Sequence, residues 1–310
     1  MKYNIDTQFY PGWTRKAITF TIDDGVLDMD RKFMDILGPA GIRGTFNLCS
    51  HKLGNMTPEQ YREFYKGYEI ANHCKYHPYL FMEGTDYKIS TDTFDAKTAD
   101  PEFLYSTEVE HLYHVHMPKG WRLIADAEGY VRFVDECHKE LEEVFGKGSV
   151  RSFVWPFNRR PNTVVDEHLS KMGYYGIRKS LLWGENEGFL LPPNWMLWGW
   201  TAGHRNFLEV AEKYEAEADD GNLKFFCLGV HSKDYEIEQK WEDLRTFART
   251  YGYRPQDYYY ATVGEIYDYQ AALKQIIITE DGVKNPTKLD LFIRIDGENT
   301  ILKAGEDLYL

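Results

Sequence analysis

Side chains that can carry charge or bind a metal follow several apolar runs of this chain. Asp23 and Asp24 come directly after the run AITFTI, and His231 comes directly after the run KFFCLGV. Adjacent carboxylates at the end of a strand point in different directions, because successive side chains of a strand lie on opposite faces. When one of the two binds a divalent cation, the other is free to accept a proton.

A pair of histidines completes a metal-ligand set. His73 and His77 stand four residues apart in HCKYH, and this spacing brings two imidazoles to one side if the segment turns helically. Two neutral imidazoles and one carboxylate form a facial set that leaves positions open for water and substrate. A divalent cation in such a site lowers the pKa of bound water and polarises a carbonyl oxygen.

Each of these signals also has a purely structural explanation. Asp-Asp-Gly is common in caps and turns, paired histidines are often surface residues, and a lone histidine such as His231 can be a hydrogen-bonded core residue. All of them, however, follow predicted strands, and caps alone do not explain that arrangement. We therefore expect these residues to form one metal-binding site.

The elements that would position these residues alternate along the chain. Short strands that alternate with helices of 10–15 residues predict βαβ units and a parallel sheet or barrel, whose ligands bind beyond the carboxyl ends of the strands. The strands are predicted at 17–22, 43–48, 68–72, 150–155, 174–178 and 223–230. The helices are predicted up to Leu37 and at 58–66, 129–145, 162–172, 206–218 and 238–251.

Two regions depart from this alternation. Residues 80–125 are polar, aromatic and weakly periodic, so we expect a long loop insertion. Its HLYHVH segment is expected to form a solvated rim or to shape substrate specificity, with His111, His114 and His116. Residues 274–310 change to a period of two with a hairpin turn at Asp296-Gly297, so we expect a small β appendage after a catalytic domain of residues 1–273.

Composition narrows the class of protein. The 310 residues carry a net charge of -13, which argues against binding to nucleic acid or to an anionic membrane and favours neutral or cationic partners. Lys224 and Lys233 bracket the last predicted strand and could approach an anionic substrate. No signal peptide or membrane span is evident, and the four cysteines form no CxxC pair, so we expect a cytoplasmic enzyme with reduced thiols.

Four short motifs resemble those of the polysaccharide deacetylase (NodB homology) family of metal-dependent carbohydrate esterases. TIDDG at 21–25 resembles TFDDG, and HCKYH at 73–77 resembles HSxxH or HTxxH. VWPF at 154–157 resembles RxPF/Y, and LGVHS at 228–232 resembles LxxH. The resemblance extends over about residues 15–270 outside the insertion and implies an α/β fold, a distorted (β/α) barrel with fewer than eight repeats.

The resemblance also implies roles for individual residues. Asp24, His73 and His77 would bind one divalent metal ion, with zinc expected and cobalt, manganese, nickel or iron as alternatives. Asp23 would be the general base that takes a proton from the metal-bound water, and His231 would protonate the leaving group. The implied reaction removes N- or O-acetyl groups from a small-molecule or oligosaccharide substrate.

Other residues are expected around the substrate. A backbone N–H near Phe157 would help to bind the oxyanion, and the pocket would include four further residues: Trp155, Pro156, Trp198 and Trp200.

The chain departs from the family pattern at several positions. Val154 stands where the family has the arginine that orients the base, so Arg159, Arg160 or Arg122 would have to substitute. No aspartate for tuning the acid histidine is present in 194–204, although Asp234 is near His231 in the sequence. In addition, Cys74 replaces the usual serine or threonine of the histidine motif.

These departures keep other functions open. The same fold could hydrolyse another non-peptide C–N bond, of the ureide or formamide type. The chain could also be a sugar-binding or scaffold protein with a vestigial metal site. The ligand set further fits Fe(II) oxygenation, but a second aspartate and an opposing histidine suit hydrolysis better. No oligomeric state is predicted.

Overall fold

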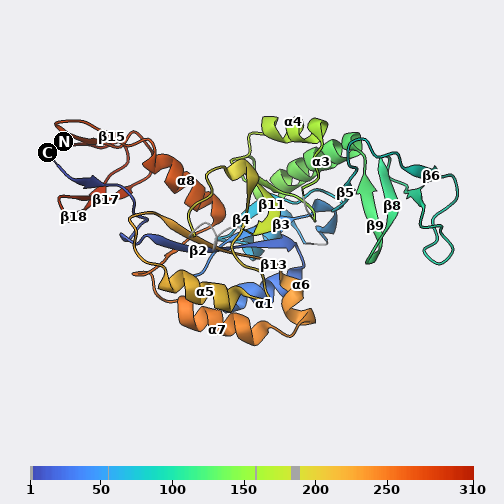
Figure 1. The fold of residues 1–310 in the computed structure, drawn as a ribbon, viewed down its shortest axis with the longest axis horizontal. Coiled ribbons are helices and arrows are strands. Elements are labelled where there is room, and N and C mark those ends of the chain that lie inside the picture. Colours follow the sequence, from blue (N-terminus) through green and yellow to red (C-terminus); the bar gives the residue numbers. More distant parts are fainter. Residues whose placement is uncertain (1–2, 55, 158, 183–188) are drawn as a thin grey trace.

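The computed structural model describes residues 3–54, 56–157, 159–182 and 189–310, and its centre is a parallel sheet that curves into a barrel (Figure 1). The strands follow the order β12-β11-β10-β4-β3-β2-β13. Ala202, just after β12, bridges to Leu228 of β13 and so nearly closes the barrel. The strands are β2 (Lys16–Asp24), β3 (Thr45–Leu48), β4 (Glu69–Asn72), β10 (Ser152–Val154), β11 (Gly176–Leu182), β12 (Trp198–Trp200) and β13 (Lys224–His231). The predicted distorted (β/α) barrel is confirmed.

Helices cover the outside of this barrel. They are α1 (Leu27–Leu37), α2 (Pro58–Phe64), α3 (Ala127–Phe145), α4 (Thr163–Lys171), α5 (Phe207–Ala216), α6 (Ser232–Ile237), α7 (Trp241–Tyr251) and α8 (Val263–Leu273). The longest, α3, begins where the Asp126 carboxylate accepts a hydrogen bond from the Gly129 N–H, and it buries one apolar stripe against the sheet. The helix expected over 238–251 is present as α7, which begins at Trp241, and the separate helix α6 that precedes it was not predicted.

The strand β2 lies at the middle of the core and sets the level of the site. Its apolar side chains are buried, because neighbouring strands flank it and helices cover the sheet. In register, Asp23 is paired with His231 of β13, and Asp24 is paired with Leu48 of β3. A short strand, β14 (Tyr259–Tyr260), pairs with the first half of β2. The carboxyl ends of β2 and β13 therefore place Asp23 and His231 side by side.

The insertion is a β-sheet, so the prediction of a long loop over 80–125 was wrong. Its strands have the order β5-β9-β8-β7-β6, and the sheet projects from the barrel at the right of Figure 1. Aromatic and histidine side chains lie on both faces, and this composition hides the alternation by which a strand is recognised. The strands are β5 (Tyr79–Leu80), β6 (Lys88–Ser90), β7 (Phe103–Ser106), β8 (Leu112–Met117) and β9 (Gly120–Ala125).

The C-terminal region has the predicted β structure and lies at the opposite end of the long axis (Figure 1). Asp296 and Gly297 have φ of 49° and 90° and form the predicted two-residue hairpin turn. The strands are β15 (Ile277–Ile278), β16 (Gly282–Lys284), β17 (Leu291–Ile295), β18 (Glu298–Leu302) and β19 (Asp307–Tyr309), and β1 (Ile5–Asp6) pairs with β17. A domain boundary after residue 273 remains a prediction.

Two predictions from composition concern the cysteines and membrane-spanning segments. Cys49, Cys74, Cys137 and Cys227 are buried and free, as expected of reduced thiols. None of the helices in the described ranges combines the length and the apolar character that crossing a bilayer requires.

Candidate active site

The two aspartates at the end of β2 occupy a strained turn. Asp24 has φ of 84° and Gly25 has φ of 70°, so the chain passes through the left-handed region directly after Asp23. For a residue with a side chain this conformation costs about 1–3 kcal/mol, and such strain is concentrated at functional sites. Both aspartates are buried, with 6% and 3% of their surface exposed. The turn directs the two carboxylates to different partners.

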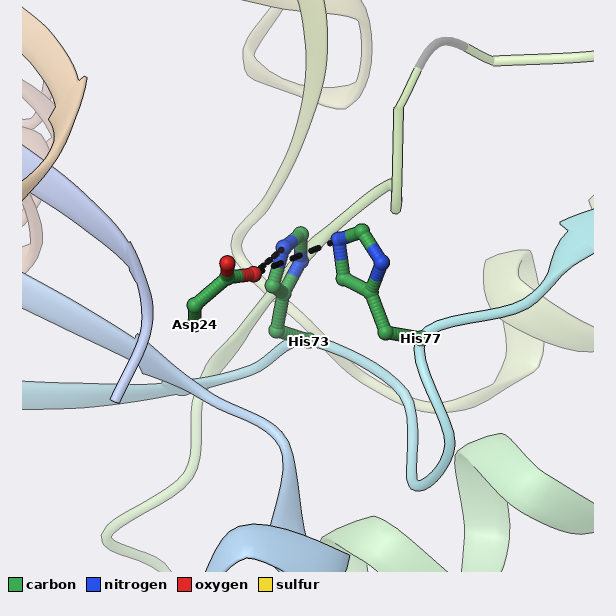
Figure 2. A group of neighbouring side chains, drawn as sticks. All are labelled: Asp24, His73 and His77. Atoms are coloured by element: carbon green, nitrogen blue, oxygen red, sulfur yellow. Dashed lines mark ion pairs between the residues drawn. The ribbon is translucent and has the colours of Figure 1, made fainter. Parts of the chain in front are cut away.

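Asp24 faces the two histidines that the sequence placed with it. Its Oδ1 atom lies 3.4 Å from His77 Nε2 and 3.8 Å from His73 Nε2 (Figure 2). One ligand atom from each of the three residues lies within 4.8 Å of the others. Asp24 Oδ1 and His73 Nε2 are both buried without a hydrogen-bond partner among the described residues. A divalent cation would satisfy both orphaned atoms, so this donor set fits a metal.

The route by which the histidines meet differs from the prediction. Cys74 and His77 have φ of 61° and 53°, so the segment is an irregular turn and not a helical one. His73 is held at β4 by a hydrogen bond of 2.8 Å from Nδ1 to the Val154 carbonyl. With Nδ1 donating, the lone pair of His73 remains on Nε2, the atom nearest to Asp24.

The protonation states suit metal ligands. Burial lowers the pKa of His73, and burial together with the neighbouring His73 lowers the pKa of His77 to about 3. Burial alone would raise the pKa of Asp24, but the two histidines and nearby cations hold it below its ordinary value. At neutral pH the set is two neutral imidazoles and one carboxylate, the forms that bind metal.

Asp23 is held by an arginine that the sequence analysis missed. Nη2 of the fully buried Arg178 donates to Asp23 Oδ1, and Asn47 Nδ2 donates to the same oxygen at 2.7 Å. Burial would raise the pKa of Asp23, but the Arg178 guanidinium, followed by His73 and His231, keeps it below its ordinary value. Asp23 is therefore ionised and fixed in place, as a general base requires.

The arginines that were expected beside Asp23 lie elsewhere. Arg159 pairs with Asp166 at 2.6 Å, and Arg160 lies over the ring of Tyr79 at 4.8 Å. Arg122, the third candidate, donates to the Trp121 carbonyl at 2.8 Å.

His231 is oriented by an acidic residue of the next helix. Its Nδ1 atom lies 2.8 Å from Asp234 Oδ2, three residues along the chain in α6. Burial would lower the pKa of His231, but the hydrogen bond with Asp234 and the nearby carboxylates raise it. A histidine that keeps its proton near neutral pH and has Nε2 free of this contact can act as a general acid.

Asp23, Asp24, His77 and His231 line one cavity of about 1270 Å³. Of the pocket residues expected from sequence, Phe157 and Trp200 line it, whereas the other three do not. Trp155 is 1% exposed and packs on Tyr130, and Trp198 is 3% exposed and packs on Trp195. These two rings, like the buried Pro156, belong to the core. From the sequence alone, aromatic residues of the core could not be distinguished from those that line the cavity.

Comparison with known proteins identifies the family. The family model for polysaccharide deacetylase matches residues 12–177, more than half of the chain. The chain belongs to the polysaccharide deacetylase family. It is accordingly a hydrolase of the class that acts on acetylated carbohydrates. No curated protein matches the sequence.

Several solved structures are similar over most of the chain. A CE4 esterase from Streptococcus mutans is 15% identical and covers 80% of this chain and 86% of its own, with a TM-score of 0.46. A family 4 carbohydrate esterase from Streptomyces lividans, in complex with acetate, is 13% identical. The match covers 76% of this chain and 88% of the esterase, with a TM-score of 0.43. A family 4 acetyl xylan esterase from Clostridium thermocellum, in complex with a cobalt ion, is 12% identical. The match covers 83% of this chain and 92% of that esterase, with a TM-score of 0.45.

Two motifs of this member of the polysaccharide deacetylase family lack a residue of the family pattern. In each case another residue lies beside the side chain concerned, Asp23 or His231. The arginine missing at Val154 has a counterpart in Arg178 on the adjacent strand β11, where Val154 and Arg178 are paired in register. The aspartate missing from 194–204 has a counterpart in Asp234. Arg178 had one signal in the sequence, since it is a charged residue at the last position of the strand predicted at 174–178.

Proposed function

We propose that this protein removes N- or O-acetyl groups from a carbohydrate by metal-dependent hydrolysis. One observation carries the proposal beyond family membership. The buried donor atoms of Asp24 and His73 have no hydrogen-bond partner among the described residues and lie beside His77. Asp24 and His77 line the same cavity as an ionised Asp23 and a hydrogen-bonded His231. A metal set between a base and an acid is the arrangement that hydrolysis of an acyl group needs.

Asp24, His73 and His77 would hold the ion, and the donor set of two nitrogens and one oxygen suits zinc, cobalt or manganese. When bound, the ion would polarise the acyl carbonyl and lower the pKa of water at the site.

Asp23 would act as the general base. Its Oδ1 is held by Arg178 and Asn47, so the carboxylate stays ionised in a fixed orientation. The base would accept a proton from water as the water oxygen adds to the acyl carbon. A positioned base of this kind contributes about 10²- to 10⁴-fold to the rate.

His231 would act as the general acid. Asp234 holds Nδ1, which leaves the Nε2 proton for the nitrogen or oxygen that departs. As the bond from the acyl carbon to that atom breaks, the proton moves from Nε2 to it, and acetate and a free amine or hydroxyl are the products. The backbone N–H near Phe157 would help to bind the oxyanion formed in between.

The alternative of a vestigial site was motivated by two missing residues. Arg178 and Asp234 occupy the two corresponding roles in geometry, and both support an active enzyme. Hydrolysis of another C–N bond would use the same base and acid, and no feature of the cavity favours it.

Release of acetate from acetylated xylo-oligosaccharides and chito-oligosaccharides tests the proposal. We expect a chelator to abolish release and zinc, cobalt or manganese to restore it. Asp23→Asn should lose about 10²-fold or more of kcat/KM while it keeps its metal, because Asp23 is not a ligand. Activity that survives chelation, or full activity in Asp23→Asn, would contradict the proposal.

A further inference from the structure

The cavity wall is cationic, although the chain as a whole carries a net charge of -13. Among the described residues, Asp23 and Asp24 are the only acidic residues that line it. Both of them serve the catalytic centre. The cationic residues of the wall are Lys52, Lys119, Arg122, Arg160, Arg205 and Lys233.

Three of these six cations lie within 4.0 Å of a carboxylate of the protein. Lys233 contacts Asp24 Oδ2 directly, and Lys52 lies 3.7 Å from the same oxygen. Arg205 pairs with Glu238, with its Nη2 atom 2.5 Å from Oε1.

The other three cations have no such carboxylate in the part of the chain that the structure describes. Over the described ranges, Lys119, Arg122 and Arg160 have no acidic group within 4.0 Å. Unpaired cations on a concave wall concentrate the field inside the cavity and raise the local concentration of anions.

Arg160 is connected to the catalytic centre by stacked rings. The ring of the metal ligand His77 lies 4.5 Å from that of Phe157, and Phe157 stacks on Tyr79 at 3.7 Å with an interplanar angle of 4°. The Arg160 guanidinium lies over the Tyr79 ring of this stack, 4.8 Å from the ring centroid. The contact with the ring limits the motion of the guanidinium and leaves its N–H groups for a ligand.

Lys119 and Arg122 come from the insertion and belong to the same wall. Met117 pairs with Gly120, so Lys119 lies in the tight turn between β8 and β9, and Arg122 lies two residues into β9. The strand β9 also pairs with β5, which carries Tyr79. Backbone pairing therefore ties the insertion to the ring stack that holds Arg160.

We propose that the substrate is an acidic oligosaccharide. The acetylated sugar unit would occupy the catalytic centre, and a neighbouring unit would present a carboxylate, sulfate or phosphate to Arg160, Arg122 and Lys119. Arginine binds all of these groups through paired N–H donors, so the shared chemistry is a planar or tetrahedral oxyanion on a sugar. The inference rests on the proposed function and replaces the neutral or cationic partner that net charge alone favours.

Binding to the metal-free wild-type protein tests the inference without turnover. Calorimetric titrations would compare a neutral xylo-oligosaccharide, the same chain with glucuronic acid branches, and a sulfated chain of equal length. We expect both acidic chains to bind about tenfold more tightly than the neutral chain at low salt. This difference should shrink as NaCl approaches 1 M, because the contacts are partly exposed. A preference for one acidic chain alone would assign the anion.

Three variants locate the effect. Arg160→Gln, Arg122→Gln and Lys119→Gln should each weaken acidic binding by about three- to tenfold and leave neutral binding within about twofold. The matched control is Lys139→Gln on α3, a lysine that is 78% exposed and does not line the cavity, which should change neither affinity.

The outcomes separate this inference from the proposed function. Equal affinity for acidic and neutral chains, binding of neither, or variants that behave like the control would overturn the acidic substrate. Acetate release from a small neutral ester in the same preparation would show that the hydrolase survives that result. If metal-loaded protein releases no acetate from any substrate but binds acidic chains as expected, the proposed function fails and the binding site stands.

Discussion

Replacing Arg178 tests whether the base of this site is held by a residue outside the family motif. The Arg178 side chain is fully buried, and its partner Asp23 has 8% of its side chain exposed. Arg178→Met keeps a long apolar side chain of similar reach in the same space, against the ring of Trp200. The carboxylate would then remain buried with the hydrogen bond from Asn47 but without its main countercharge.

The structure sets the size of two effects. Removing one partner of a buried ion pair costs about 3–5 kcal/mol of unfolding free energy, because the other charge stays buried and unpaired. Loss of the orientation of the base should lower kcat/KM by about 10²-fold. Burial then dominates the pKa of Asp23, so the pKa rises and the acid limb of the pH profile moves to higher pH.

Acetate release and denaturant unfolding measure these effects. In an Asp23→Asn background, Arg178→Met should cost less than about threefold in kcat/KM, because there is no carboxylate left to orient. Arg151→Met is the matched control, since its pair with Asp268 is 44% and 36% exposed and should contribute less than about 1 kcal/mol. An Arg178→Met enzyme with wild-type kcat/KM and pH profile would refute the positioning role.

Three other variants test neighbouring parts of the account. Asp234→Asn should lower the pKa of His231 and move the basic limb of kcat/KM to lower pH, and an unchanged limb would count against the pairing. Burial raises the pKa of Asp30 to about 6, so ionisation between pH 4 and 6 costs wild-type stability. The free energy of unfolding of Asp30→Asn relative to wild type should therefore rise by about 3 kcal/mol between pH 4 and 6. Thermal unfolding at each pH would show this as a rising difference in midpoint, and a constant difference would contradict it. Gly229→Ala would place a Cβ 2.2 Å from Trp200 Cγ, so denaturant titration should show a loss of about 1–3 kcal/mol; unchanged stability would show that the ring moves freely.

The strand ends could be predicted from sequence because their pattern is local. An apolar run followed by Asp23-Asp24 indicates both a buried strand and the point where it reaches the edge of the sheet. In a parallel barrel all such points meet at one edge, so Asp24, His73 and His77 were expected together, and they lie together in the structure.

Features that depend on neighbouring elements could not be predicted in this way. Arg178 of β11 contacts Asp23 of β2 because both side chains point into the barrel. The two residues are far apart in the sequence, so the sequence does not indicate this contact. Cys74 and His77 both have left-handed φ, a conformation that is uncommon in residues other than glycine, and this turn brings His73 and His77 together.

The insertion was missed for a different reason. In β8, Tyr113 and His114 are both partly buried on opposite faces, so apolar and polar residues do not alternate there. Sheets whose two faces are aromatic lack the signal on which strand prediction depends. The two cations that this sheet contributes to the cavity wall, Lys119 and Arg122, were not predicted there for the same reason, since a loop was expected at their positions.

The central claim is that Asp24, His73 and His77 bind one divalent metal ion. Elemental analysis of the purified protein after incubation with zinc, cobalt, manganese and nickel, followed by desalting, tests it directly. We predict about one ion per chain in the wild type, loss of the ion in His77→Ala, and retention in His168→Ala, a surface histidine paired with Asp135. No metal in the wild type, or equal metal in His77→Ala, would contradict the account.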